Sequence, residues 1–210
     1  MQADRPAPGE EINRGAATVP RLAASVIILR GGAEMLELLL LQRNPAARFM
    51  GGAWVFPGGA VDPGDGEDED ARLRGAALRE VAEEAGVALA GPDALVPFSR
   101  WITPPELRIR FDTHFFLAPL ADRAKARADG NETVAHAWHT PAGALAAFRA
   151  GALQLVFPTL KQLEQLAGFA SADALLQWAR GRAIVPVQPR VDLSGETARL
   201  VLPGEPGYED

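Results

Sequence analysis

Two long apolar runs near the start of the chain constrain its fold more than any other feature. They cover Leu22–Leu29 and Met35–Leu41, and the connection between them contains Gly31 and Gly32. Two apolar segments joined by a short glycine-containing connection predict a β-hairpin. Because nearly every position is apolar, rather than every second one, both faces of these strands should be covered. The sequence therefore predicts a sheet inside an α/β sandwich.

The remainder of the chain alternates between strand-like and helix-like segments. A short strand at Trp54–Phe56 should end in the turn Pro57-Gly58-Gly59. Pro, Asp or Ser opens each predicted helix, and glycine follows most of them, as is typical of helix ends. Further strands are expected at residues 94–101, 110–118 and 136–139, and helices at residues 70–85, 141–150, 158–167 and 171–181.

Composition excludes several classes of protein. With 210 residues, 48% hydrophobic and 23% charged, the chain is typical of a globular protein, and no apolar run approaches the roughly 18 residues of a membrane span. The net charge of −6 disfavours nucleic acid as a partner. The absence of cysteine excludes disulfides and thiolate metal sites, and it fits a cytoplasmic protein, as does a start without a secretion signal.

The segment Arg79–Val87, with the sequence REVAEEAGV, is the part of the chain most indicative of chemistry. On a helix, Glu80 and Glu84 lie one turn apart with Glu83 beside them, at the border of the apolar face. Carboxylates half-shielded from water suit Mg²⁺ or Mn²⁺, and Arg79 can pair with Glu83 one turn away. By itself, this pattern fits a solvated helix face equally well.

Taken together, Gly59–Asp65 and Arg79–Val87 resemble the Nudix box, G-x5-E-x7-R-E-U-x-E-E-x-G-U, in which U is aliphatic. The second half matches at every specified position. The first half departs twice: Asp65 replaces the family's glutamate, and 13 residues instead of seven separate it from Arg79. We expect the six additional residues, 66–71, to form an exposed, mobile bulge before the helix that coordinates no metal.

The resemblance implies a Nudix-type α/β/α sandwich with a mixed β-sheet, and a divalent metal cofactor, Mg²⁺ or Mn²⁺. It also implies roles for residues on this chain. Arg79 would orient the carboxylates, Glu83 or Glu132 would accept a proton from water, and Gly59 would let the backbone approach the substrate. The sequence is equally consistent with Glu132 being an exposed loop residue without a role in catalysis. The implied metal ligands are Glu80, Glu83, Glu84 and the carbonyl oxygen of Gly58.

A finer resemblance concerns the substrate. The segments Leu40–Arg43, Phe56–Gly59, Trp101–Pro104 and Arg110–Phe116 are similar to patterns of coenzyme A diphosphatases, one branch of which carries insertions inside the box. The simpler signature, that of coenzyme A diphosphatases without such insertions, has Leu and His where this chain has Ala47 and Met50. These two departures leave the substrate open.

The function expected is therefore metal-dependent hydrolysis of a diphosphate in a nucleoside diphosphate linked to another group, with coenzyme A or an acyl-coenzyme A as the candidate substrate. Arg43 would bind the phosphates. The alternatives are an ADP-ribose or NADH diphosphatase and a non-catalytic Nudix-fold binding module. The partner is a small molecule, and a homodimer is left open.

These features divide the chain into three parts. Residues 1–20 should form a flexible N-terminal tail, because they combine Pro, Gly and charged residues without periodicity. Residues 21–185 should form one Nudix hydrolase domain that includes the C-terminal helices. Residues 186–210 should form an extended segment packed on that domain.

Overall fold

The computed structural model describes residues 11–13, 15–47, 50–121, 125–194 and 198–208. Most of the predicted N-terminal tail therefore lies outside the described residues, as do residues 48–49, 122–124, 195–197 and 209–210. The helices are α1 Glu69–Ala85, α2 Pro141–Arg149, α3 Phe157–Leu166 and α4 Ala172–Ala179, with short 3-10 turns at Pro63–Asp65 and Pro92–Ala94. The strands are β1 Arg21–Arg30, β2 Glu37–Arg43, β3 Trp54–Val55, β4 Gly58–Ala60, β5 Val96–Ile102, β6 Phe111–Pro119, β7 Thr133–His139, β8 Pro186–Val187, β9 Arg190–Asp192 and β10 Arg199–Val201.

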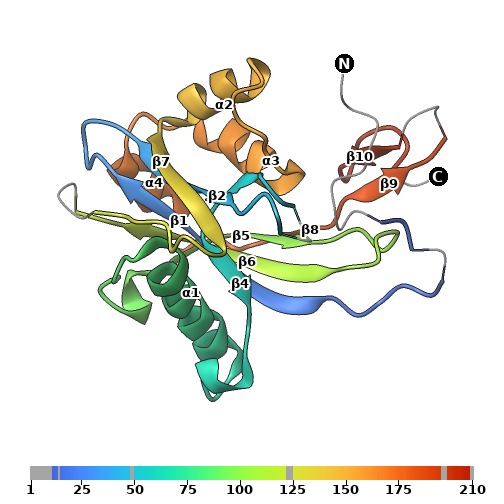
Figure 1. The fold of residues 1–210 in the computed structure, drawn as a ribbon, viewed down its shortest axis with the longest axis horizontal. Coiled ribbons are helices and arrows are strands. Elements are labelled where there is room, and N and C mark those ends of the chain that lie inside the picture. The colour runs from blue at the N-terminus through green and yellow to red at the C-terminus, as the bar shows by residue number, and fades with distance from the viewer. Residues whose placement is uncertain (1–10, 14, 48–49, 122–124, 195–197, 209–210) are drawn as a thin grey trace.

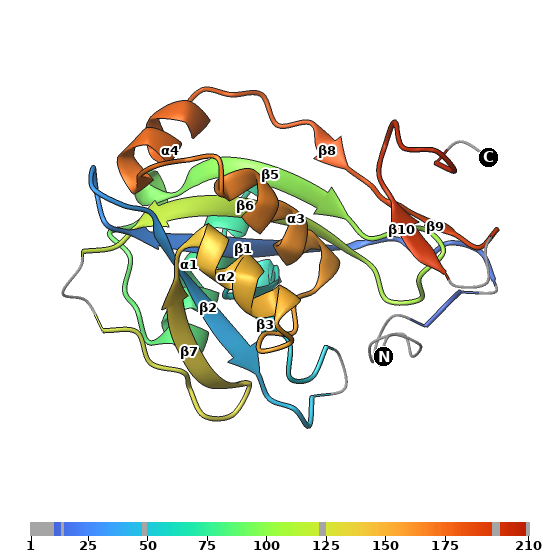
Figure 2. The same ribbon diagram turned by 90° about the horizontal axis from the view of Figure 1, so that it is seen from above.

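A mixed eight-stranded sheet forms the middle layer of the molecule. Its strand order is β3-β2-β1-β6-β5-β8, with β4 paired to β1 and β7 paired to β2. Helix α1 lies on one face of this sheet, and α2, α3 and α4 lie on the other (Figures 1 and 2). The predicted α/β/α sandwich with a mixed β-sheet is confirmed.

Strand β1 shows why both apolar runs are covered on both faces. Its side chains alternate between two cores, so that Ile27 and Leu29 pack towards α2–α4 while Val26 and Ile28 pack towards α1. The predicted hairpin is present, but its antiparallel pairing is confined to the end next to the connection, at Leu29–Leu38 and Arg30–Glu37. Beyond that point the two strands diverge, and the edges that they leave pair with β4 on β1 and with β3 on β2. On their other edges, β1 pairs in parallel with β6 and β2 pairs with β7.

The glycines after β3 are not the turn that we predicted. Gly58 and Gly59 belong to β4, which pairs antiparallel with β1. A Cβ on Gly58 would lie 2.4 Å from the carbonyl oxygen of Ala24, so only glycine allows this close pairing. Pro57 lies between β3 and β4. Its carbonyl accepts hydrogen bonds from the amide of Val26 and the hydroxyl of Ser25, both in β1.

The inserted stretch at residues 66–71 is exposed from Glu67 onwards, as predicted, but it is not a simple bulge. Helix α1 begins at Glu69, inside this stretch, and the side chain of Asp68 caps it by accepting a hydrogen bond from the amide of Ala71 at 2.8 Å. Acidic residues at the start of a helix interact favourably with its dipole, which explains why this acidic segment extends the helix. The 3-10 turn before it packs directly on α1, since a Cβ on Gly75 would lie 1.9 Å from the carbonyl oxygen of Asp65.

The C-terminal residues pack along the sheet and around the connection between β5 and β6. Strand β8 pairs with β5, and β9 pairs with β10. Near the other terminus, Ile12 forms a β-bridge with Leu107 of the same connection. Figures 1 and 2 show β9 and β10 on this side of the molecule. The limits of the tail, domain and C-terminal segment, at residues 20 and 185, stay predictions.

Within the described residues, no helix is long and apolar enough to cross a membrane.

Candidate functional site

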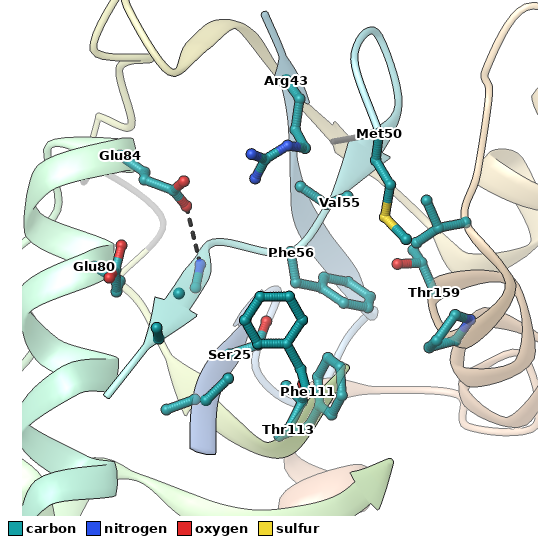
Figure 3. Close-up of a pocket in the computed structure, with 18 of the residues that line it drawn as sticks. Ser25, Arg43, Met50, Val55, Phe56, Glu80, Glu84, Phe111, Thr113 and Thr159 are labelled. Atoms are coloured by element: carbon teal, nitrogen blue, oxygen red, sulfur yellow. Dashed lines mark hydrogen bonds between the residues drawn. The ribbon is translucent and has the colours of Figure 1, made fainter. Parts of the chain in front are cut away.

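A cleft of about 440 Å³ lies between α1, the start of α3 and the edge formed by β1, β4 and β6 (Figure 3). We call it the acidic cleft. It brings together every site residue predicted from the sequence, although these come from four separate parts of the chain. The predicted residues that line it are Arg43, Gly58, Gly59, Arg79, Glu80, Glu83, Glu84 and Glu132.

Glu84 is the most buried of the three glutamates, with only 4% of its surface exposed. Its Oε2 accepts a hydrogen bond from the amide of Gly58 at 2.9 Å, drawn as a dashed line in Figure 3. Burial raises the pKa of Glu84 to about 7, although the hydrogen bond from Gly58 favours the charged form. Burial also raises the pKa of Glu80, whereas Glu83 is exposed. The cleft therefore holds two shielded carboxylates close to a third that is in water.

Arg79 ties these carboxylates to the loop before α1. It pairs with Asp65 through two hydrogen bonds, at 2.9 and 3.0 Å, and it also donates to Glu80 at 2.7 Å. The predicted ion pair with Glu83 is confirmed at 3.3 Å. Hydrogen bonds from Arg79 lower the pKa of Asp65. Asp65, which departs from the family pattern, is thus the firmest partner of Arg79, and its shorter side chain still reaches the guanidinium.

The donor chemistry of the cleft suits a hard divalent cation, because its acidic wall offers carboxylate oxygens from one rigid helix. Burial raises the pKa of both Glu80 and Glu84, a penalty that a bound cation would relieve. In the part of the chain that the structure describes, no group of three or more acidic or histidine side chains is arranged around a common point. Instead, Glu80 and Glu83 face Arg79, and Glu84 faces the Gly58 amide.

Gly59 lies directly against Glu80. A Cβ at this position would be 2.3 Å from Oε1 of Glu80, so any side chain here would displace the carboxylate. Arg43 lies across the cleft, and in Figure 3 its guanidinium points towards Glu84. Its positive charge favours the charged form of Glu84, which opposes part of the effect of burial.

Glu132 reaches the rim of the cleft from a loop that is anchored to α1. The hydroxyl of Thr133, which is fully buried, donates to the backbone carbonyl of Glu84 at 2.9 Å. Asp129 accepts hydrogen bonds from the amides of Thr133 and Glu132, at 2.7 and 3.0 Å. Burial acts to raise the pKa of Asp129, but these hydrogen bonds outweigh it and lower the pKa to about 2. The loop therefore holds Glu132 at a fixed place beside the acidic helix.

Sequence reasoning missed four residues that contribute to the site. Arg21, the first residue of β1, lines the cleft, and its position gave no signal in the sequence. The hydroxyl of Ser25 donates to the carbonyl of Pro57 at 2.9 Å and so supports the chain just before Gly58. Thr133 and its partner Asp129 follow the pattern of an Asp turn, D-G-N-E-T, which could have indicated an anchored loop.

The Nudix class of hydrolases is defined by an α/β/α sandwich in which a helix with the sequence REVAEE lies beside two consecutive glycines and a strand that carries an arginine. The chain matches the NUDIX domain family over residues 19–157, and it belongs to that family. It is a Nudix diphosphatase, an enzyme that hydrolyses the diphosphate of nucleoside diphosphate derivatives. Enzymes of this family generally use divalent metal ions.

Individual relatives resemble the chain over most of its length. It is 25% identical to acyl-coenzyme A diphosphatase NUDT19 of Homo sapiens over 274 aligned positions, covering 84% of this chain and 73% of that protein. It is 26% identical to the putative nudix hydrolase 7 of Caenorhabditis elegans, covering 90% and 75%. Among solved structures, a NUDIX hydrolase from Alicyclobacillus acidocaldarius is 29% identical with a TM-score of 0.69, covering 77% of this chain and 97% of that one.

Proposed function

We propose that this enzyme hydrolyses the diphosphate of coenzyme A or of an acyl-coenzyme A, giving 3′,5′-ADP and a 4′-phosphopantetheine product. The observation that carries the proposal is the division of the acidic cleft into a charged side and an apolar side. Glu80 and Glu84 lie on the α1 side with Arg43 facing them, and Met50 and Phe111 lie farther from α1 (Figure 3). A substrate that joins a diphosphate to a long, weakly polar arm matches this division. The resemblance to an acyl-coenzyme A diphosphatase supports the same choice.

The site residues take the following roles in this proposal. Glu80, Glu83, Glu84 and the carbonyl of Gly58 hold Mg²⁺ or Mn²⁺, which neutralises diphosphate charge and lowers the pKa of water when it is bound. Arg79, fixed by Asp65, positions the carboxylates of Glu80 and Glu83. Glu83 or Glu132 accepts the proton from the attacking water, since both are exposed to solvent at the rim.

Two arginines bind the anionic groups of the substrate. Arg43 faces the carboxylate cluster from across the cleft, so its guanidinium can bind a diphosphate that lies between them. Arg21 lines the same cleft at the start of β1 and supplies a cation for the 3′-phosphate. Gly59, which keeps the backbone open next to Glu80, leaves room for the phosphates beside the acidic helix.

A substrate panel tests this proposal. Coenzyme A, butanoyl-coenzyme A, ADP-ribose, NADH and nucleoside triphosphates are incubated with Mg²⁺ or Mn²⁺, and products are separated by chromatography. We expect the coenzyme A species to have the highest kcat/KM, with turnover abolished by excess chelator and restored by added metal. If ADP-ribose or NADH exceeds every coenzyme A species by about tenfold in kcat/KM, a difference of about 1.4 kcal/mol, the substrate assignment is wrong.

A further inference from the structure

A second, smaller cavity of about 90 Å³ adjoins the acidic cleft on the side away from α1. We call it the apolar chamber. The same side chains face both spaces, so the two share a wall rather than lying on separate surfaces. The residues common to both are Met50, Thr103, Thr113, Phe115 and Pro158.

The chemistry of the apolar chamber differs sharply from that of the cleft. None of the described residues that line it is charged, and its polar side chains are two threonines. One of these, Thr103, already accepts a hydrogen bond from the amide of Phe111 at 3.0 Å. A nucleobase, which carries several ring and exocyclic polar groups, would leave them without partners at a cost of about 1–3 kcal/mol each. An aliphatic group would bury its surface at no such cost.

The walls of the chamber come from distant parts of the chain. Trp101, Ile102, Pro104, Leu107 and Ile109 come from β5 and the connection that follows it, and Phe157 comes from the start of α3. Pro189 and Leu200 complete the lining, and both lie beyond residues 19–157, the part that matches the family.

The C-terminal wall is held in place by an ion pair. Arg190 of β9 pairs with Glu106 at 2.7 Å, and Glu106 belongs to the connection between β5 and β6. Pro189 is buried next to this ion pair, and Leu200 pairs with Val191 in the β9–β10 ladder. The chamber is therefore a defined space of this chain and not a gap beside a loose end.

We propose that the apolar chamber binds a short acyl or similar aliphatic end of the substrate, on the group attached to the diphosphate opposite the nucleoside. This inference rests on the proposed diphosphatase function and names the substrate class that the same site prefers. An apolar cavity of about 150 Å³ holds one benzene molecule, so a space of about 90 Å³ accepts an end of only a few carbon atoms. The enzyme should therefore prefer short acyl thioesters to the free thiol and to long-chain thioesters.

Substitution at the chamber wall tests the proposal. Ile109→Trp fills the chamber, and the fold should tolerate it because 43% of Ile109 is exposed. We expect wild-type enzyme to prefer butanoyl-coenzyme A to coenzyme A by about tenfold or more in kcat/KM, as small changes in apolar contact can give. The variant should reduce this ratio to about one. Leu200→Asp, which places a charge in the chamber wall, should have the same effect.

Leu193→Trp is the matched control, since Leu193 is 57% exposed in the same C-terminal part of the chain and does not line the chamber. It should leave the ratio unchanged, and thermal unfolding should show that all three variants are folded. A wild-type ratio near one, or a ratio that neither chamber variant alters, would contradict the chamber while leaving the diphosphatase function intact.

If no coenzyme A species is hydrolysed, the proposed function fails, and butanoyl-pantetheine then tests the chamber alone because it lacks the diphosphate. Ligand-observed NMR should detect its binding to wild-type protein and the loss of that binding in Ile109→Trp. Absence of binding to the wild type would overturn the inference.

Discussion

The two sides of the acidic cleft are built on different principles. On the α1 side, charged groups are fixed by many hydrogen bonds, and Arg79 alone contacts Asp65, Glu80, Glu83 and the carbonyl of Ala60. The opposite side consists largely of apolar contacts around Phe115 and Pro158. A charged group tolerates little displacement when it is buried, whereas an apolar wall changes mainly in size and shape. The comparison suggests that bond cleavage depends on one side and choice of substrate on the other.

The largest expected effect comes from the charged side. Glu84→Gln keeps the size of the side chain and an oxygen that accepts from the Gly58 amide, but it removes the negative charge. We expect kcat to fall by roughly a hundredfold or more, with little change in folding, as when a ligand to a catalytic ion is lost. Steady-state kinetics and thermal unfolding measure the two quantities. Glu164→Gln, at an exposed position of α3, is the control and should retain full activity. An active Glu84→Gln enzyme would remove Glu84 from the proposed metal site.

Arg43→Ala should affect binding more than chemistry. Removing a charged hydrogen-bond donor to a phosphate costs about 1.5–3 kcal/mol, so we expect KM for coenzyme A to rise by about ten- to a hundredfold while kcat changes less. Arg149→Ala, at the exposed end of α2, controls for the loss of one positive charge. A fall in kcat alone would instead place Arg43 in the chemical step.

Asp65→Asn tests the pair of hydrogen bonds between Asp65 and Arg79, which we call the clamp. The clamp acts indirectly, because Arg79 positions the carboxylates of Glu80 and Glu83. The substitution removes the charge that pairs with Arg79 in two hydrogen bonds. We expect a loss of about tenfold in kcat with unchanged KM, as is found when a group that orients metal ligands is altered. Asp62→Asn is a close control, because Asp62 is 67% exposed and lies 3.8 Å from Arg79. Equal effects of the two changes would show that general charge near Arg79, and not the clamp, is what matters.

The smallest expected effect concerns the inserted stretch. Asp68→Ala removes the N-cap of α1 and should lower the free energy of unfolding by about 1 kcal/mol, with kcat unchanged. Chemical denaturation measures this difference. Glu67→Ala, one residue earlier and exposed, should have almost no effect. If the Asp68 variant loses activity in proportion to stability, the first turn of α1 contributes to the site as well as to the helix.

The sequence predicts most of this architecture where the determinants are local. The continuous apolar run in β1 and the helical periodicity around Glu80 depend only on neighbouring residues, and so does the crowding of three glutamates on one helix. The clamp between Asp65 and Arg79 could not be predicted in the same way, because it requires the turn before α1 to fold back over the helix. The prediction of a bulge at the inserted stretch was wrong for a related reason. The spacing of the family motif shows where residues are added, but it does not show whether they extend a helix or a loop.

The apolar chamber could be predicted from the sequence even less than the clamp. Its walls join the β5–β6 connection to Pro189 and Leu200, which are separated from it by three helices in the sequence. No local pattern relates these segments. The pairing of β8 with β5, the ion pair between Glu106 and Arg190, and a hydrogen bond from the amide of Val191 to Glu106 bring them together.

The parallel pairing of β1 with β6 has a consequence for how the molecule forms. Nine consecutive pairs join these strands, and each pair links residues 90 positions apart in the chain. Such contacts must wait until the intervening loop, including α1, has closed, so folding should be slow compared with that of a helical protein of this size. During synthesis, β1 would leave the ribosome long before its partner, with an apolar strand unpaired. Early β2 pairing at the hairpin end would then protect only the last two residues of that strand.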